Sequence, residues 1–566
     1  MFSTFRLSMT WLHTWFGLVL GYVLVVVFFF GSLSVFDREI DRWALPETRF
    51  APQPMPSFDA MLAPIFERMS PAADELEAAR ARVGGALPEV LPATSWGAYT
   101  THRDPVLELF AEFAVTNNPD DPDDHVHGQA TIDPRNGKPL PDDRLKIGSE
   151  FFYPMHFRLH LTWKDIGYWI VGLAAMAMLA ALVSGIVIHR RIFREFFTFR
   201  PHKHTQRSVL DLHNLTGVVA LPFHFFFALT GLTIFADMYL PVSETMFASQ
   251  AHAAEMAEAQ SKGLPFEPAG VSAPLASVDA MVVEAKRRWA ARGMPGEVGY
   301  LFVEHVGDRN SYVSLYRAGS DRVTLIGQAI HFEGVTGRVL HEEPPPTVVA
   351  GINDYLTGLH LQHFEHWPLR WLYVLGGLLG CVCIATGFIF FVEKRKRQHA
   401  RAGAGGARWV DAMAVATVAG MVVAALSILV ANRLLPADLE HRDAWEKGAF
   451  WCAWLLAFAH AAWRSAAVQD ARLSPAWREQ CCAIAVLAVA AVILNWITTG
   501  DHLWKTLAAR YWPVAGLDLA LLVVATIAAA AALALGRRER AAQRAHESGH
   551  PDARQVTEDA PEIVRA

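Results

Sequence analysis

Four histidines occupy matching positions in two parts of the sequence. His13 and His213 lie about 200 residues apart near the start of two apolar stretches, and His160 and His360 precede two others. A histidine in a membrane span is unfavourable unless it is paired, solvated or bound to a metal. Two neighbouring helices that each offer an imidazole at the same depth can bind a haem iron from both sides. The pattern therefore predicts two haems in two layers, one held by His13 and His213 and the other by His160 and His360.

Small residues recur together with these histidines. Leu-His-x-x-x-Gly begins at Leu12 and again at Leu212, and a second glycine follows each histidine at the same distance. The recurring positions are Gly17 and Gly217, Gly31 and Gly231, and the Ser184-Gly185 and Thr386-Gly387 pairs. A glycine one helical turn from a ligand leaves room for a flat macrocycle against the helix.

His224 is a secondary candidate because it breaks the repeat. Its counterpart in the first half is Leu24, and it falls near the middle of its apolar stretch. It can serve as a ligand in another pairing, as a partner of a ligand, as a proton relay, or as a histidine hydrogen-bonded to a neighbouring helix.

A bare metal site is the chemical alternative to haem. His156 is spaced i,i+4 from His160, and His363 is spaced i,i+3 from His360, so each pair shares a helical face. With Glu365 and His366 they can bind copper, zinc or iron.

The elements that must position these side chains are membrane spans. The chain has 566 residues, of which 52% are hydrophobic. Eight stretches are long enough to cross a bilayer: 10–36, 163–189, 208–240, 367–392, 409–431, 448–467, 479–498 and 514–536. Arginine and lysine gather in 190–207, 393–408 and after 536, which places these loops and both termini in the cytoplasm. We expect no nucleic-acid partner, because the net charge of −6 comes with long acidic segments on the other side.

The spans divide the chain into a repeat and a separate block. The expected segments are 1–36 (first span), 37–160 (first outer domain), 161–190 (second span), 191–207 (basic cytoplasmic loop), 208–240 (third span), 241–365 (second outer domain), 366–395 (fourth span), 396–408 (cytoplasmic linker), 409–536 (four-helix membrane block) and 537–566 (disordered tail). Both copies of the span–domain–span unit start from the cytoplasm, so the repeat is parallel.

Each outer domain has an α+β pattern. Residues 59–83 and 276–292 have helical periodicity, while 106–115 and 311–317 alternate like strands. Residues 129–140 predict a hairpin with Asn-Gly at its turn, and 334–340 repeat that ending. The five cysteines all lie in or beside spans, and there is no Walker motif and no GxGxxG after a strand. The sequence therefore predicts no disulfide framework and no nucleotide or flavin domain.

The Leu-His-x-x-x-Gly openings, the Ser-Gly and Thr-Gly endings, and the hairpin that closes on Asp133-Pro-Arg-Asn-Gly-Lys138 resemble the PepSY-associated transmembrane helix family. The resemblance covers residues 1 to about 395. It implies a mainly α membrane protein with two periplasmic PepSY-like domains, and b-type haem as in the ferric-siderophore reductases of that family. It carries the ligand role to His13, His160, His213 and His360. Two departures stand out: the histidine-rich run around His363, which offers that residue as an alternative ligand, and the added four-helix block.

These observations together predict a bacterial inner-membrane protein that transfers electrons through two haems b. The expected donor is a cytoplasmic flavoprotein or a quinol, and the expected acceptor is a periplasmic ferric siderophore or chelated iron. One alternative is a non-enzymatic membrane protein whose PepSY-like domains bind a peptide, metal or protein. Another is a metal or solute transporter that uses the outer histidines and the 409–536 block.

Overall fold

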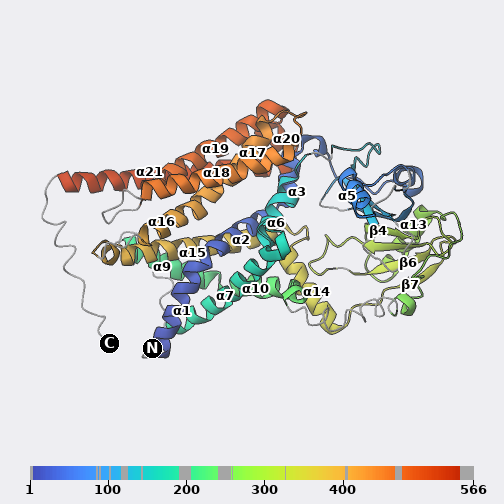
Figure 1. The fold of residues 1–566 in the computed structure, drawn as a ribbon, viewed down its shortest axis with the longest axis horizontal. Coiled ribbons are helices and arrows are strands. Elements are labelled where there is room, and N and C mark those ends of the chain that lie inside the picture. The colour runs from blue at the N-terminus through green and yellow to red at the C-terminus, as the bar shows by residue number, and fades with distance from the viewer. Residues whose placement is uncertain are drawn as a thin grey trace. The chain divides into compact units, whose positions relative to one another are not determined.

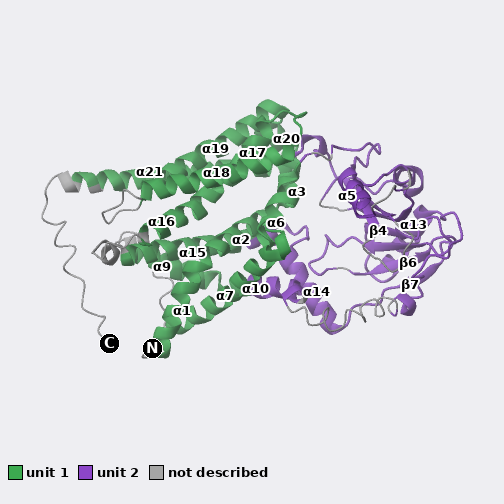
Figure 2. Cartoon of the chain, in the orientation of Figure 1, with its two compact units in different colours: residues 1–44, 145–225, 374–566 green, residues 45–144, 226–373 purple. Residues whose placement is uncertain are grey.

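The fold combines long helices with one antiparallel sheet (Figure 1). The computed structural model describes residues 4–83, 87, 91–100, 104–115, 125–141, 144–189, 200, 205–239, 257, 259–325, 327–401, 406–465 and 474–547. The chain separates into two compact units (Figure 2). The helical unit comprises residues 1–44, 145–225 and 374–566, and the sheet unit comprises residues 45–144 and 226–373.

Apolar helices dominate the helical unit. Its helices, including two that continue into the other unit, are α1 (Phe5–Val19), α2 (Gly21–Ser34), α3 (Asp37–Ala44), η3 (Ile147–Phe152), α6 (Tyr153–Phe157), η4 (Trp163–Asp165), α7 (Ile166–Ile188), α9 (Thr205–Val219), α10 (Leu221–Ile234), α15 (Trp367–Arg401), α16 (Gly406–Val415), η5 (Ala416–Gly420), α17 (Met421–Leu434), α18 (Arg442–Ser465), α19 (Pro475–Thr499), α20 (Leu503–Ala508) and α21 (Trp512–Glu547).

The number of spans is smaller than the eight expected. Five helices of the described residues are long and apolar enough to cross a membrane, and two bent pairs raise this to seven. The missing stretch, 448–467, lies in α18, where several tryptophans, His460 and Arg464 lower the mean hydropathy. The tail 537–566 was expected to be disordered, but its first part is helical, because α21 continues to Glu547. Most of the basic 191–207 loop and the end of the tail lie outside the described residues.

Two spans are sharply bent at equivalent positions. The α1 and α2 axes differ by 59° across Leu20, and the α9 and α10 axes differ by 62° across Ala220. From the sequence we expect one continuous span at each place, although Pro222 follows the second break as the second residue of α10. His13 and His213 therefore lie on the first segment of each pair, before the bend.

The sheet unit contains one seven-stranded antiparallel sheet. Its strands are β1 (Ala93–Tyr99), β2 (Leu107–Ala114), β3 (His125–Ile132), β4 (Val298–Glu304), β5 (Tyr312–Arg317), β6 (Ala329–Glu333) and β7 (Val339–Glu342), and its helices are η1 (Pro46–Thr48), η2 (Phe58–Leu62), α4 (Ala63–Phe66), α5 (Ala73–Val83), α11 (Ala236–Tyr239), α13 (Val278–Ala291) and α14 (Val348–Leu361). The strand order is β3-β2-β1-β4-β5-β6-β7. Strands from 37–160 and 241–365 thus share one sheet through the β1–β4 pair, where two separate α+β domains were expected.

The two predicted turns adopt the same geometry. Gly137 donates its N–H to the carbonyl of Asp133 at 2.8 Å, and Gly337 donates to Glu333 at the same distance. Both glycines have positive φ, 69° and 72°, which a residue with a Cβ rarely adopts. The Asn-Gly turn predicted at 136–137 is confirmed, and so is its recurrence.

Two helices exchange caps across the sheet unit. Asp279, in the first turn of α13, accepts the Phe58 N–H at 2.7 Å at the start of η2. Asp59, in the first turn of η2, accepts the Val278 N–H at 2.9 Å at the start of α13. Each carboxylate thereby satisfies a helix N-terminus other than its own. This reciprocal contact holds the two sequence segments together on the helix side of the sheet.

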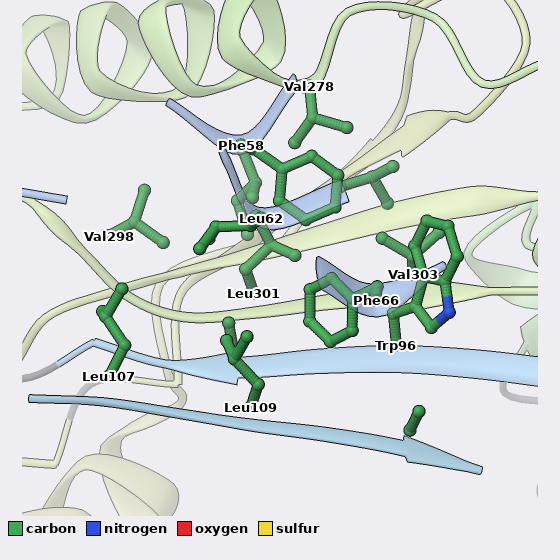
Figure 3. Close-up of a cluster of buried hydrophobic side chains, with 14 of the residues drawn as sticks. Phe58, Leu62, Phe66, Trp96, Leu107, Leu109, Val278, Val298, Leu301 and Val303 are labelled. Atoms are coloured by element: carbon green, nitrogen blue, oxygen red, sulfur yellow. The ribbon is translucent and has the colours of Figure 1, made fainter. Parts of the chain in front are cut away.

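The core lies between these helices and one face of the sheet (Figure 3). Phe66 stacks on Trp96 with ring centres 5.2 Å apart. Leu301 and Val303 of the joining strand are fully buried beside Phe58. Because residues from both sequence segments contribute to one cluster, they form one folding unit, and neither buries its apolar face alone.

The four-helix block packs on the remainder of the helical unit through polar and aromatic contacts. Trp43 of α3 donates its indole N–H to Asp518 of α21 at 2.8 Å, and both side chains are buried. Arg433 of α17 donates to the Ala44 carbonyl. Phe450 of α18 lies 6.0 Å from Phe30 of α2, measured between ring centres. The block is therefore attached to the point where the first span ends.

Candidate functional site

His13 and His213 approach each other in the helical unit. Their ring centres are 6.1 Å apart and their planes are nearly perpendicular, at 86°. Nδ1 of His13 is 2.9 Å from the Ala181 carbonyl of α7, and Nδ1 of His213 is 2.7 Å from the Cys383 carbonyl of α15. Since a carbonyl only accepts, each Nδ1 must carry the proton. Each neutral imidazole therefore retains an Nε2 lone pair.

The separation of the two rings suits coordination of one metal ion. An imidazole nitrogen lies roughly 1 Å from its ring centre and binds a metal at about 2 Å, so two axial imidazoles have centres about 6 Å apart. A direct edge-to-face contact between rings occupies the same range, about 4.5–7 Å. The structure thus brings together His13 and His213, the pair expected from the sequence. Their separation fits both the coordination of one metal ion and a direct contact between the rings.

The small residues around this pair lie where the imidazoles need space. A Cβ added to Gly185 would be 3.3 Å from the His13 ring, and one added to Gly387 would be 3.4 Å from the His213 ring. Gly17, one turn after His13, has no atom within 4 Å of such a position. Two of these glycines make room for the imidazoles, and the third borders open space.

His360 has a similar environment in the sheet unit. Its Nδ1 is 2.7 Å from the hydroxyl of Thr230. A Cβ on the adjacent Gly231 would be 3.3 Å from the His360 ring, and the Phe227 ring lies edge-on at 6.4 Å. The Thr230 hydroxyl already donates to the Phe226 carbonyl, so it accepts from His360, whose Nδ1 carries the proton.

His156 occupies the equivalent environment in the first half of the repeat. Its Nδ1 is 2.8 Å from the Val27 carbonyl of α2. A Cβ added to Gly31, the counterpart of Gly231, would be only 2.6 Å from that Nδ1. His156 therefore faces the first-half glycine as His360 faces the second-half glycine.

His160 lies differently. It follows the short helix α6 with a φ of 53°, and the preceding Leu159 has the same unusual value. Its Nε2 is 2.8 Å from the Phe151 carbonyl, and its ring stacks on the Phe151 ring at 4.6 Å. The matching Leu-His-Leu triplets make His160 the counterpart of His360 in the sequence repeat. The contacts of His156 with Val27 and Gly31, however, resemble those of His360 more closely.

His224 is buried near the bend of its span. Only 1% of its surface is exposed, and its Nε2 has no hydrogen-bond partner among the described residues. Its ring lies edge-on to Phe28 at 5.3 Å, and a Cβ on Gly380 would be 3.1 Å from its Nε2. Phe28 and Gly380 of α15 pack closely against this histidine.

The outer metal cluster, the alternative to haem, is not assembled in the described part of the chain. His363 is exposed after α14, Glu365 accepts the Ser320 hydroxyl, and His366 accepts the Leu369 N–H. Among the described residues no group of three or more His, Cys, Asp or Glu side chains is arranged to hold a metal ion. The acidic residues before His125 lie outside the described residues.

Two contacts in these environments were not foreseen from the sequence. The Thr230 hydroxyl precedes Gly231, yet its first-half counterpart is Phe30, so comparison of the two halves gives it no weight. Cys383 lies beside His213 with its Sγ 3.6 Å from Nδ1, and its place in an apolar stretch gave no indication of this contact. A search for polar residues directly before each repeated glycine finds Thr230.

Comparison with known proteins identifies relatives of the first two thirds of the chain. Residues 10–394 match the family described as the PepSY-associated TM region. An uncharacterized protein of Pseudomonas aeruginosa is 25% identical over 289 residues, which cover 48% of this chain and 69% of that protein. The 409–536 block lies outside the range matched to the family.

Proposed function

Because the chain belongs to the family defined by the PepSY-associated TM region, we propose that it transfers electrons across a membrane through two b-type haems. The membrane is the bacterial inner membrane, and the basic loops keep both termini in the cytoplasm. The donor is a cytoplasmic flavoprotein or a quinol, and the acceptor is a periplasmic ferric siderophore or other chelated iron.

The pairing of His13 with His213 carries this proposal. Their ring separation of 6.1 Å equals the spacing that two axial imidazoles require, and each Nδ1 is bonded to the main chain of another helix. A bond at Nδ1 fixes the tautomer and the ring orientation, as it does in protein metal sites generally. The open space at Gly17 supports a flat group beside the pair.

As ligands of the second haem we propose His360 and His156. This choice rests on the internal repeat and on the environment of each histidine within its own unit. Both bond through Nδ1, and both lie against the repeated glycine of the preceding span. His160, His363 and His224 remain candidates for the same role; His160 already uses Nε2 for a carbonyl.

When bound, the haems would supply a one-electron couple on each side of the bilayer. The chain would supply the axial imidazoles, hold their tautomers and exclude water with the rings around them. Carbonyl or hydroxyl oxygens accept a hydrogen bond from Nδ1–H of each of the four histidines, and the proposal requires no proton transfer by them.

A visible spectrum of the full-length protein, purified in detergent from haem-replete cells, tests the proposal. We expect b-type bands that sharpen on reduction with dithionite and a haem content of two per chain. His13→Ala and His213→Ala should each lower this content to one, whereas His441→Ala, at an exposed position, should leave it unchanged. A haem-free wild-type protein would reject electron transfer and favour a binding or transport role.

The second pair has a separate test. His156→Ala and His360→Ala should each remove one haem, and combining either with His13→Ala should remove both. His160→Ala is the matched control, since it lies four residues from His156 and should retain two haems. Loss of haem in His160→Ala with retention in His156→Ala would restore the pairing expected from the Leu-His-Leu triplets.

A further inference from the structure

The sheet has a second face that the core helices do not use. Side chains alternate along a strand, so the residues next to the core residues Trp96, Leu109 and Leu301 point the other way. At the centre of this face the outward residues are Ser95, Gly97 and Tyr99 of β1, Glu108, Phe110 and Glu112 of β2, Tyr300, Phe302 and Glu304 of β4, and Tyr312, Ser314 and Tyr316 of β5. We call this set the aromatic face.

The rings of the aromatic face form one continuous layer. Phe110 stacks on Tyr300 with ring centres 6.0 Å apart and on Phe302 at 6.1 Å, and Tyr99 lies 4.7 Å from Tyr300. Gly97 lies between Phe110 and Phe302 in the register, and a side chain there would overlap the Phe110 ring. The missing side chain lets Phe110 lean across β1 and join rings from both sequence segments.

The aromatic face is also acidic at one end. Glu112 and Glu304 both lie opposite Ser95, one row beyond Phe110 and Phe302. The Ser95 hydroxyl donates to Glu112 at 2.9 Å. No lysine or arginine occupies an outward position on β1, β2, β4 or β5 within the described ranges. Burial, with Glu112 nearby, raises the pKa of Glu304 to about 7, so this carboxylate carries its full charge only above that pH.

The charge and the rings select the same kind of ligand. The face of an aromatic ring carries negative electrostatic potential and attracts cations. Glu112 and Glu304 lie on strands whose described outward positions carry no lysine or arginine, so they attract the same charge and repel an anion. Tyr99 is half exposed, so at least this edge of the layer is open to solvent. A neutral apolar compound would gain binding free energy only from stacking on the rings, whereas a planar cation would gain it from stacking and from attraction to the carboxylates.

We propose that the aromatic face binds a planar aromatic cation, stacked on the Tyr99–Phe110–Tyr300–Phe302 layer with its charge toward Glu112 and Glu304. A flat ring system matches a layer built from stacked rings, and offset stacking of aromatic groups is favourable. This site is independent of the haem proposal, because none of its residues belongs to the candidate haem ligands.

Fluorescence titration of the full-length protein in zwitterionic nanodiscs tests the site. Proflavine, a three-ring cation, is the probe, and 9-anthracenecarboxylate, a three-ring anion of similar size, is the comparison; empty nanodiscs supply the background. We expect saturable proflavine binding and at least tenfold weaker binding of the anion. Binding that does not saturate, or equal binding of the two probes, overturns the proposal.

Three variants localise the site. Tyr300→Leu and Glu304→Gln should each weaken proflavine binding by roughly three- to tenfold, the range of one cation–π or charge interaction. Tyr300→Phe should retain binding because the ring remains. Glu284→Gln, on the outer surface of α13 beside Arg287 and Arg288, is the matched charge control and should have no effect. Unchanged affinity in both Tyr300→Leu and Glu304→Gln, with the wild-type melting temperature, would exclude this face as the binding site.

Discussion

The absence of a Cβ at two glycines leaves room for the imidazoles of the candidate ligands. Gly31 and Gly231 each lie against an imidazole, but the space differs: the added Cβ would be 2.6 Å from His156 and 3.3 Å from His360. Sequence comparison found the glycines and both histidines, because they recur with fixed spacing. It predicts His160 through the Leu-His-Leu motif, whereas our proposal of His156 depends on backbone torsions at Leu159 and His160 that this motif does not reveal.

Gly31→Ala should therefore displace His156. Its methyl group cannot share space with Nδ1 at 2.6 Å, so the ring must move and its bond to Val27 must break. We expect one haem per chain, lost from the same pair that His156→Ala affects, by absorbance of the purified protein. Gly351→Ala is the control, because its Cβ would make only ordinary contact at 3.8 Å. Two retained haems in Gly31→Ala would argue against His156 as a ligand.

At the scale of elements, local patterns were predictable and long-range pairings were not. The glycine turns at Gly137 and Gly337 follow from a conformation that few other residues adopt, and the periodicity of 276–292 predicted α13 closely. The β1–β4 pair joins strands about 200 residues apart, and alternation alone does not say which strands are neighbours. For the same reason the exchange of caps by Asp59 and Asp279 could not be read from the sequence.

Asp59→Ala and Asp279→Ala should loosen the opposite helix in each case. Asp59→Ala removes the partner of the Val278 N–H in α13, and Asp279→Ala removes the partner of the Phe58 N–H in η2. Loss of a cap costs about 1 kcal/mol, so amide exchange in the affected first turn should accelerate roughly fivefold. Hydrogen–deuterium exchange of the full-length protein measures this. Faster exchange only in the helix that carries the mutation would refute reciprocal capping.

At the scale of the whole molecule, residues 10–394, which match the family, are joined to the 409–536 block, which lies outside that match. The junction uses buried polar contacts, which are unfavourable in a membrane unless each group is satisfied. Trp43 and Asp518 satisfy each other, and Asn495 also lies within 3.4 Å of Asp518. The sequence predicts the block as a separate set of apolar helices, but single polar residues such as Asp518 gave no indication of their partners. The block therefore acts as a support for α3, at the end of the first span.

Asp518→Ala should weaken this junction. It leaves the buried Trp43 N–H without an acceptor, which costs about 1–3 kcal/mol, and the full-length protein in detergent should melt at a lower temperature. Asp518→Asn keeps an oxygen acceptor, so its melting temperature should lie closer to that of the wild type. The two variants together separate loss of the hydrogen bond from loss of the charge. Tryptophan fluorescence during heating reports the transition. Equal melting of wild type and Asp518→Ala would show that the Trp43 contact does not stabilise the junction, and the support of α3 would then depend on Arg433 and the Phe450–Phe30 contact.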